Sequence, residues 1–104
     1  MQYANRYGYT DTTPYEVVRV VSNKTLEVRR MAFERDPDWK PHFEVGGFAG
    51  NCTNQESQRW IITPDNDPEN PVFRIRLGRN GWKDKGGQLY RIESEPKRFY
   101  DYNF

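Results

Sequence analysis

The sequence predicts an all-β domain: a small antiparallel barrel or a strongly bent sheet of five to seven strands, with little helix. Three observations predict it. Short runs of β-branched and aromatic residues recur along the chain, and turn residues follow each run. Leu and Ala, two favoured helix formers, are scarce. No apolar stripe at helical spacing is long enough to predict a helix.

Length and composition allow one compact domain. The chain has 104 residues, 35% of them hydrophobic, but aromatic residues make up 15%. Each aromatic side chain can bury about 150–250 Å², so a few rings can fill a small core. We expect residues 1–14 to be a polar N-terminal leader and residues 15–104 to be a single β domain. The net charge of +1 gives no general electrostatic case for nucleic acid.

Alternating or β-branched runs predict the individual strands. Residues 15–21 hold four valines, and with the alternating residues 25–31 they predict a hairpin closed by a short turn. Further strands are predicted at the ranges 60–63, 72–77 and 89–93.

The segments between these strands carry turn and loop signals. Pro37 and Pro41 predict an ordered loop over residues 32–42. Glycines within residues 43–50 predict a tight bend, or a backbone that passes close to a ligand. Residues 51–58 fit one helical turn or an irregular loop, and residues 64–71 a long polar turn. The aromatic tail after Pro96 is expected to dock on the domain.

Catalytic signatures are missing from the sequence. His42 is the only histidine, so a zinc site of the usual Cys/His type lacks ligands, and its surroundings favour a structural or surface role. There is no phosphate loop and no nucleophile elbow. The acidic cluster of residues 65–69 lacks the spacing of a calcium loop. We therefore predict a protein that is not an enzyme and uses no cofactor and no metal.

Cysteine usage and hydropathy predict a cytoplasmic location. Cys52 has no second cysteine with which to form an internal disulfide, which suits a reducing compartment. The first residues lack the apolar segment of a signal peptide, and no apolar stretch approaches the roughly 20 residues of a membrane span. We expect no membrane partner.

Two sets of residues stand out as candidate binding groups. Arg74 and Arg76 share the outward face of a predicted strand, where guanidinium groups can bind phosphate, or can pair with carboxylates on neighbouring strands. The carboxamides of Asn54, Gln55 and Gln58 can read a polar ligand by paired hydrogen bonds, or can tie down a long loop by bonding its backbone.

Several motifs resemble a family of small phage and prophage proteins. They are the Gly-Gly-Phe and Cys-x-Asn-Gln-x-x-Gln-x-Trp patterns within residues 46–60, Arg-Leu at 76–77, Asn-Gly-Trp at 80–82, and the Tyr-Asp-Tyr-Asn-Phe end of the tail. Asn51 stands where this family often has His. The resemblance implies a phage or prophage origin, and therefore the cytoplasm of a bacterial host.

Three binding functions follow from these observations. The first is a non-enzymatic accessory or counter-defence protein that blocks a host protein through aromatic and Arg side chains. The second is sequestration of a small nucleotide-like signalling molecule, with phosphate held by Arg and bases stacked on aromatics. The third is nucleic-acid binding by a small barrel. The residues expected to carry binding are Trp39, Phe48, Asn54, Gln55, Gln58, Trp60, Arg74, Arg76 and Trp82.

Overall fold

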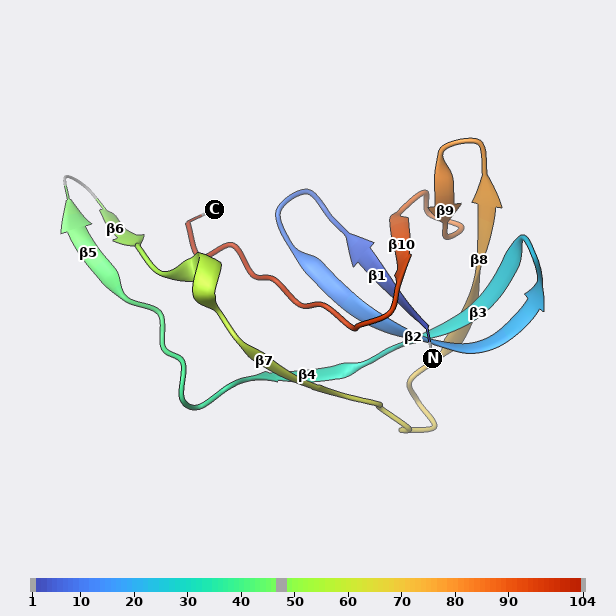
Figure 1. Ribbon diagram of the computed structural model, residues 1–104, viewed down its shortest axis with the longest axis horizontal. Helices are drawn as coiled ribbons and strands as arrows, with labels where there is room; N and C mark the ends of the chain where they lie inside the picture. Colours follow the sequence, from blue (N-terminus) through green and yellow to red (C-terminus); the bar gives the residue numbers. More distant parts are fainter. Residues whose placement is uncertain (1, 47–48, 104) are drawn as a thin grey trace.

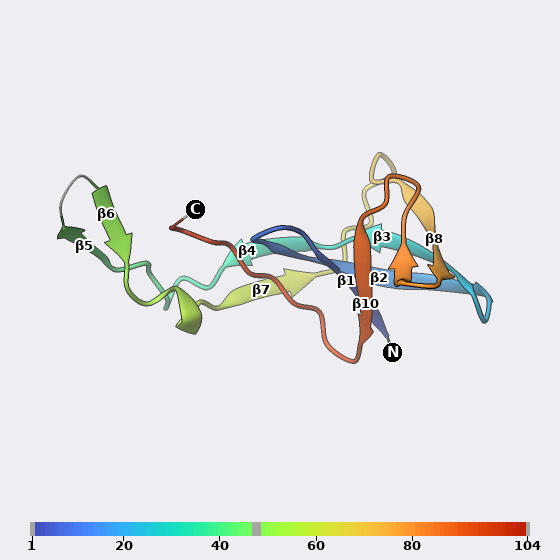
Figure 2. The ribbon, with the colours of Figure 1, turned by 90° about the horizontal axis from the view of Figure 1, so that it is seen from above.

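The protein consists of a small β-barrel from which a long arm extends (Figure 1). This computed structural model describes residues 2–46 and 49–103, and the side chains of residues 45–50 are not described. The molecule measures 51 × 29 × 25 Å. The arm accounts for its long axis, as Figure 2 shows from a second direction.

Six antiparallel strands close the barrel in the order β1-β10-β9-β8-β3-β2. They are β1 (Tyr3–Tyr7), β2 (Thr12–Ser22), β3 (Thr25–Arg30), β8 (Val72–Gly78), β9 (Gly81–Lys83) and β10 (Leu89–Glu93). The predicted fold class, a small all-β barrel, is confirmed. So is the hairpin expected from its valines: β2 pairs with β3, with Val17 opposite Val28.

The prediction of a leader over residues 1–14 is wrong. Residues 3–7 form β1, which pairs with β2 on one side and with β10 on the other, so this segment closes the barrel. The sequence did not predict β1 because the strand shows no apolar alternation. Its two fully buried side chains are Ala4 and the polar Asn5.

Aromatic rings fill the barrel, as the composition indicated. Tyr15 meets Phe73 and Tyr90 edge to face, with ring centroids 5.6 and 5.3 Å apart. Val28 and Ile75 are fully buried beside them. Edge-to-face pairs of this kind add about 0.5–1.5 kcal/mol to the effect of burial alone.

The arm consists of two short antiparallel ladders outside the barrel. In the first, β4 (Ala32–Arg35) pairs with β7 (Trp60–Thr63). In the second, β5 (Phe43–Gly46) pairs with β6 (Ala49–Cys52). A 3₁₀ turn, η1 (Gln55–Ser57), joins β6 to β7, so the helical turn is the one of the two alternatives for residues 51–58 that the structure contains.

Of two loop predictions, one is thereby corrected. Residues 32–35 of the expected loop 32–42 are a strand, because β7 supplies them with backbone partners. Most of the expected glycine bend over residues 43–50 belongs to the β5–β6 hairpin, and its centre lies outside the described residues.

Asn5 connects the barrel to the segment that follows β10. Its side-chain amide donates to Glu93 Oε1 at 3.0 Å and to the Glu95 carbonyl at 2.9 Å, and its oxygen accepts from the Lys97 backbone N–H at 2.8 Å. A buried amide without such partners would cost several kcal/mol. The C-terminal tail, residues 96–103, leaves the barrel here and runs back along the arm (Figure 1).

Truncation of Ile75 tests the barrel core. Ile75→Ala should lower the free energy of unfolding by about 2–5 kcal/mol, because the side chain is fully buried. The control Val20→Ala alters a side chain that is 63% exposed and should change it by less than about 1 kcal/mol. Urea unfolding measures both, and equal effects would contradict the core assigned here.

Glu93 should make stability depend on acid pH. Burial raises the pKa of Glu93, but hydrogen bonds from Lys97, Tyr7 and Asn5 outweigh it and hold the pKa at about 2. The folded pKa lies below the unfolded value, so this stabilisation is complete above about pH 4.5 and is lost as the pH falls towards 2. Glu93→Gln should flatten the dependence of unfolding free energy on pH in that window. An unchanged slope would contradict the assignment.

Candidate functional site

A large hollow lies against the barrel, between the β8–β9 hairpin and the loop from β9 to β10. Its volume is about 970 Å³. The residues that line it are Arg6, Tyr15, Phe73, Arg74, Arg76, Leu77, Gly78, Arg79, Asn80, Gly81, Lys83, Asp84, Lys85, Gly86 and Tyr90. We call it the basic hollow.

Cationic side chains dominate this lining. Four arginines and two lysines face one acidic residue, Asp84. Asp84 is already occupied: Oδ1 accepts from the backbone N–H groups of Gly86 and Gln88 at 2.8 and 3.0 Å, and Oδ2 accepts from the Tyr90 hydroxyl at 2.9 Å. Its carboxylate thus shapes the β9–β10 loop, and the lining keeps a large positive excess.

Most of these cations have no acidic partner. Among the described residues, Arg76, Arg79, Lys83 and Lys85 form no salt bridge. Arg76 and Lys83 are direct cross-strand neighbours of β8 and β9. Like charges directly opposite each other in a sheet are destabilising, and an anion between them would remove that repulsion.

The other two cations are partly engaged. Arg74 Nε lies 3.3 Å from Glu27 Oε2, and Glu27 also lies 3.7 Å from Arg19. The Arg6 guanidinium lies over the Tyr15 ring, 5.6 Å from its centroid. The sharing of Glu27 between two arginines leaves positive charge at the edge of the hollow.

Aromatic and aliphatic side chains complete the lining. Phe73 is half-buried and Leu77 is 40% exposed, so both offer apolar surface to a ligand. Tyr15 and Tyr90 are buried. Burial, then the hydrogen bond to Asp84, raises the pKa of Tyr90 well above its usual range, so its hydroxyl stays protonated and donates.

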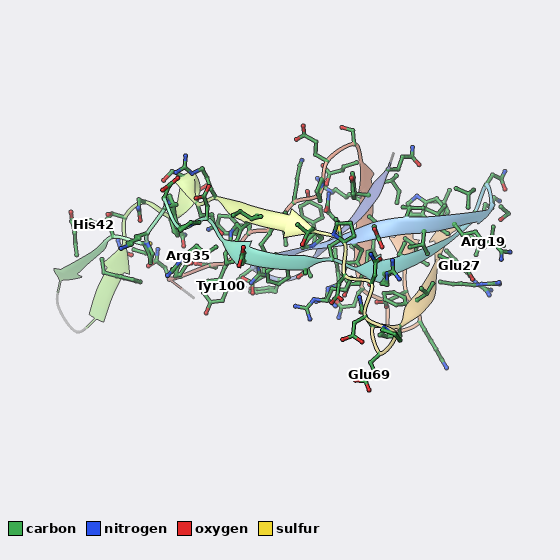
Figure 3. The ribbon with its side chains drawn as sticks, turned by 90° about the horizontal axis from the view of Figure 1, so that it is seen from below. Arg19, Glu27, Arg35, His42, Glu69 and Tyr100 are labelled. Atoms are coloured by element: carbon green, nitrogen blue, oxygen red, sulfur yellow. The ribbon has the colours of Figure 1, made fainter. Side chains whose placement is uncertain are left out.

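Charge is segregated along the molecule. Residues 32–71, which comprise the arm and the turn before β8, hold three basic and eight acidic residues, whereas the rest of the chain holds thirteen basic and seven acidic residues. Figure 3 shows His42 on the arm and Arg19 at the far end of the barrel, with Glu69 on the turn between β7 and β8. The overall charge of +1 therefore conceals an acidic arm and a basic barrel.

The structure separates the nine predicted binding residues into groups. Arg74 and Arg76 line the basic hollow. Asn54, Gln55 and Gln58 brace the arm instead, by bonding backbone groups. Asn54 accepts from the His42 N–H and donates to the Lys40 carbonyl.

The two glutamines attach the tail to the arm. Gln58 donates to the carbonyls of Gln55 and Tyr100, and its oxygen accepts from Trp60 Nε1 and the Tyr100 N–H. Gln55 Oε1 accepts from the Tyr102 N–H. Of the two interpretations open for residues 51–60, these contacts support the one in which the amides tie down a loop.

The described aromatic residues that were predicted to bind a ligand pack within the structure instead. Trp39 is 6% exposed, and its Nε1 donates to Ser57 Oγ. Trp60 is half-buried against Phe33, and Trp82 is half-buried against the barrel core. Phe48 lies outside the described residues.

Arg98 of the tail is held among aromatic rings. Its guanidinium carbon lies 4.3 Å from the ring centroid of Phe33 and 5.1 Å from that of Trp60. Burial lowers the pKa of Arg98, and its buried Nε has no hydrogen-bond partner among the described residues. Cation–π contacts of this kind fix the tail against β4 and β7.

Four cations of the basic hollow were not predicted from the sequence: Arg6, Arg79, Lys83 and Lys85. Arg6 lies in the presumed leader, and the other three lie in or next to the short strand β9, which no alternation marks. The one available signal was the density of basic residues over 74–85, on both sides of the Asn80–Gly81 turn.

Comparison with family models, curated proteins and solved structures found no match to this chain. Within the described residues, no helix has the length and apolar character needed to cross a membrane. Nor do the described His, Cys, Asp and Glu side chains gather in any group of three or more that could hold a metal ion.

Loss of the Gln58 side chain should release the tail from the arm. Gln58→Ala removes four hydrogen bonds, so we expect trypsin to cleave at Arg35 or Arg59 at least about 10-fold faster than in the parent, through local opening. Gln88→Ala is the control, because only the backbone of Gln88 takes part in a hydrogen bond that is described. Equal cleavage rates in the two variants would contradict the bracing role.

Proposed function

We propose that this protein is a non-enzymatic binding protein whose basic hollow captures a phosphate-bearing small molecule of the nucleotide class. The observation that carries the proposal is the set of six cations around one hollow, four of them without an acidic partner among the described residues. Guanidinium groups bind phosphate in two-point geometry, and lysines add point charges.

The shape and lining of the hollow favour a small ligand. Its volume of about 970 Å³ lies at the upper end of the range for small-molecule sites. Phe73 and Leu77 supply apolar surface for a base, while Arg76 and Lys83 hold phosphate. The described lining contains no His, Cys or Ser, which supports binding without turnover.

Nucleic-acid binding is the second candidate, and the charge segregation favours it. A chain of net charge +1 needs strong separation of its charges to attract a polyanion, and the barrel and arm have that separation. Single-stranded nucleic acid would use the same cations, with affinity that falls steeply as salt is added.

Blockage of a host protein receives less support from the same residues. Trp39 is buried and Trp60 and Trp82 are half-buried, so they present little of the aromatic surface on which that hypothesis rested. The resemblance to phage and prophage proteins supports a setting in the cytoplasm of an infected bacterium. There, sequestration of a nucleotide-like signal would counter host defence.

Binding can be tested with ATP, pyrophosphate, adenosine and a dT10 oligonucleotide. A ligand at 100 times its dissociation constant should stabilise the fold by about 2.7 kcal/mol. Thermal shift and calorimetry should show ATP bound, adenosine not bound and pyrophosphate bound more weakly. Arg76→Ala and Lys83→Ala should each weaken ATP binding about 10-fold or more, since hydrogen bonds to charged groups contribute about 1.5–3 kcal/mol.

The matched control is Arg91→Ala, which removes the same charge from an exposed position outside the hollow. Its affinity for ATP should stay within about twofold of the parent. Binding of the oligonucleotide alone would favour the second candidate. No binding of any probe at 1 mM would overturn both.

A further inference from the structure

The molecule exposes more surface than a compact protein of its mass. Its accessible area is 7381 Å², whereas a folded monomer of this mass is expected to expose about 6,100 Å². Its radius of gyration is 15.8 Å, against about 13 Å expected for a compact domain of this length. The excess of about 1,200 Å² in one chain is more than the roughly 800 Å² that each partner contributes to a standard-sized protein interface.

The β4–β7 ladder leaves strand edges open. It is a sheet of only two strands, and in the described part of the chain neither outer edge pairs with another strand. The tail covers the face that carries Phe33 and Trp60, as the contacts of Arg98 show. Ile61 lies on the other face and is 42% exposed. Open edges of this kind pair readily with a strand from another chain.

Charge complementarity points to a second copy of this chain as the occupant. The arm and the turn before β8 have a net charge of −5, and the rest of the chain has a net charge of +6. Pairing two arms antiparallel would place each acidic arm beside the other copy's basic barrel. A two-fold interface is self-complementary in this way, because each copy supplies both surfaces.

We propose that two copies associate in antiparallel fashion through the open edges of their β4–β7 ladders, with each acidic arm lying against the partner's barrel. The association buries the exposed arm and offsets the repulsion among the barrel cations. It requires no ligand, so its tests are made without nucleotide and their outcome is separate from that of the proposed function.

Reversed charges provide a matched pair of variants. The arm variant Glu34→Lys/Glu56→Lys and the barrel variant Arg79→Glu/Lys85→Glu alter exposed side chains that form no salt bridge within the described residues. Each variant alone weakens the attraction at both contacts of the pair, because the arm and turn change from −5 to −1, or the rest of the chain from +6 to +2. In an equimolar mixture, the heterodimer regains one parental contact, −5 against +6, because each variant keeps one parental surface.

Sedimentation equilibrium measures the result, with circular dichroism to confirm that each variant is folded. The parent should be dimeric at about 50 mM salt, and its association should weaken at least about 10-fold at about 500 mM, where charges are screened within a few ångströms. Each variant should associate at least about 10-fold more weakly than the parent at about 50 mM salt, and the mixture should associate more tightly than either variant alone. A parent that is monomeric at low salt, variants that dimerise like the parent, or a mixture that associates no more tightly than either variant alone would each overturn the proposal.

Discussion

Closure of the barrel by β1 is the constraint on which the rest of the structure depends. This strand supplies the missing neighbour for both β2 and β10, so without it both would be open edges. Asn5 makes the closure specific, because its buried amide must bond Glu93, Glu95 and Lys97 together. The same three bonds fix the direction in which the tail leaves the barrel. The course of the tail along the arm therefore follows from one buried side chain in β1.

The C-terminal tail stabilises the arm. Two-stranded ladders are marginally stable alone in water, and the arm contains two of them. Gln58 and Arg98 supply the additional contacts: one bonds the backbone of Tyr100, and the other is held among the rings of Phe33 and Trp60. The polar side chains of residues 51–60 are thus used in assembling the arm. The groups proposed to bind a ligand lie instead on the barrel, around the basic hollow.

The sequence could predict the strands whose burial alternates, and little of the arm. The ranges 15–21, 25–31, 72–77 and 89–93 fall within or close to barrel strands. Apolar and polar residues alternate in 25–31 and 72–77, whereas four valines mark 15–21. β1 was not predicted because it buries the small Ala4 and the polar Asn5, so its sequence has no apolar alternation. β4 was not predicted because its partner, β7, lies 25 or more residues away. Arg74 and Arg76 were found from alternation, but their neighbour Lys83 depends on the β8–β9 register, which the sequence does not specify.

Arg76 and Lys83 connect the stability of the barrel to its proposed ligand. Each pairs across strands with the other, and neither has an acidic partner among the described residues. Such a pair lowers the stability of the free protein, although solvent screens part of the repulsion. Acidic residues are plentiful in this chain, yet eight of the fifteen lie within residues 32–71. The unbalanced hollow and the acidic arm are therefore two results of one distribution of charge. A bound phosphate and the carboxylates of a second copy's arm would both stabilise the barrel by the same interaction, the neutralisation of its cations.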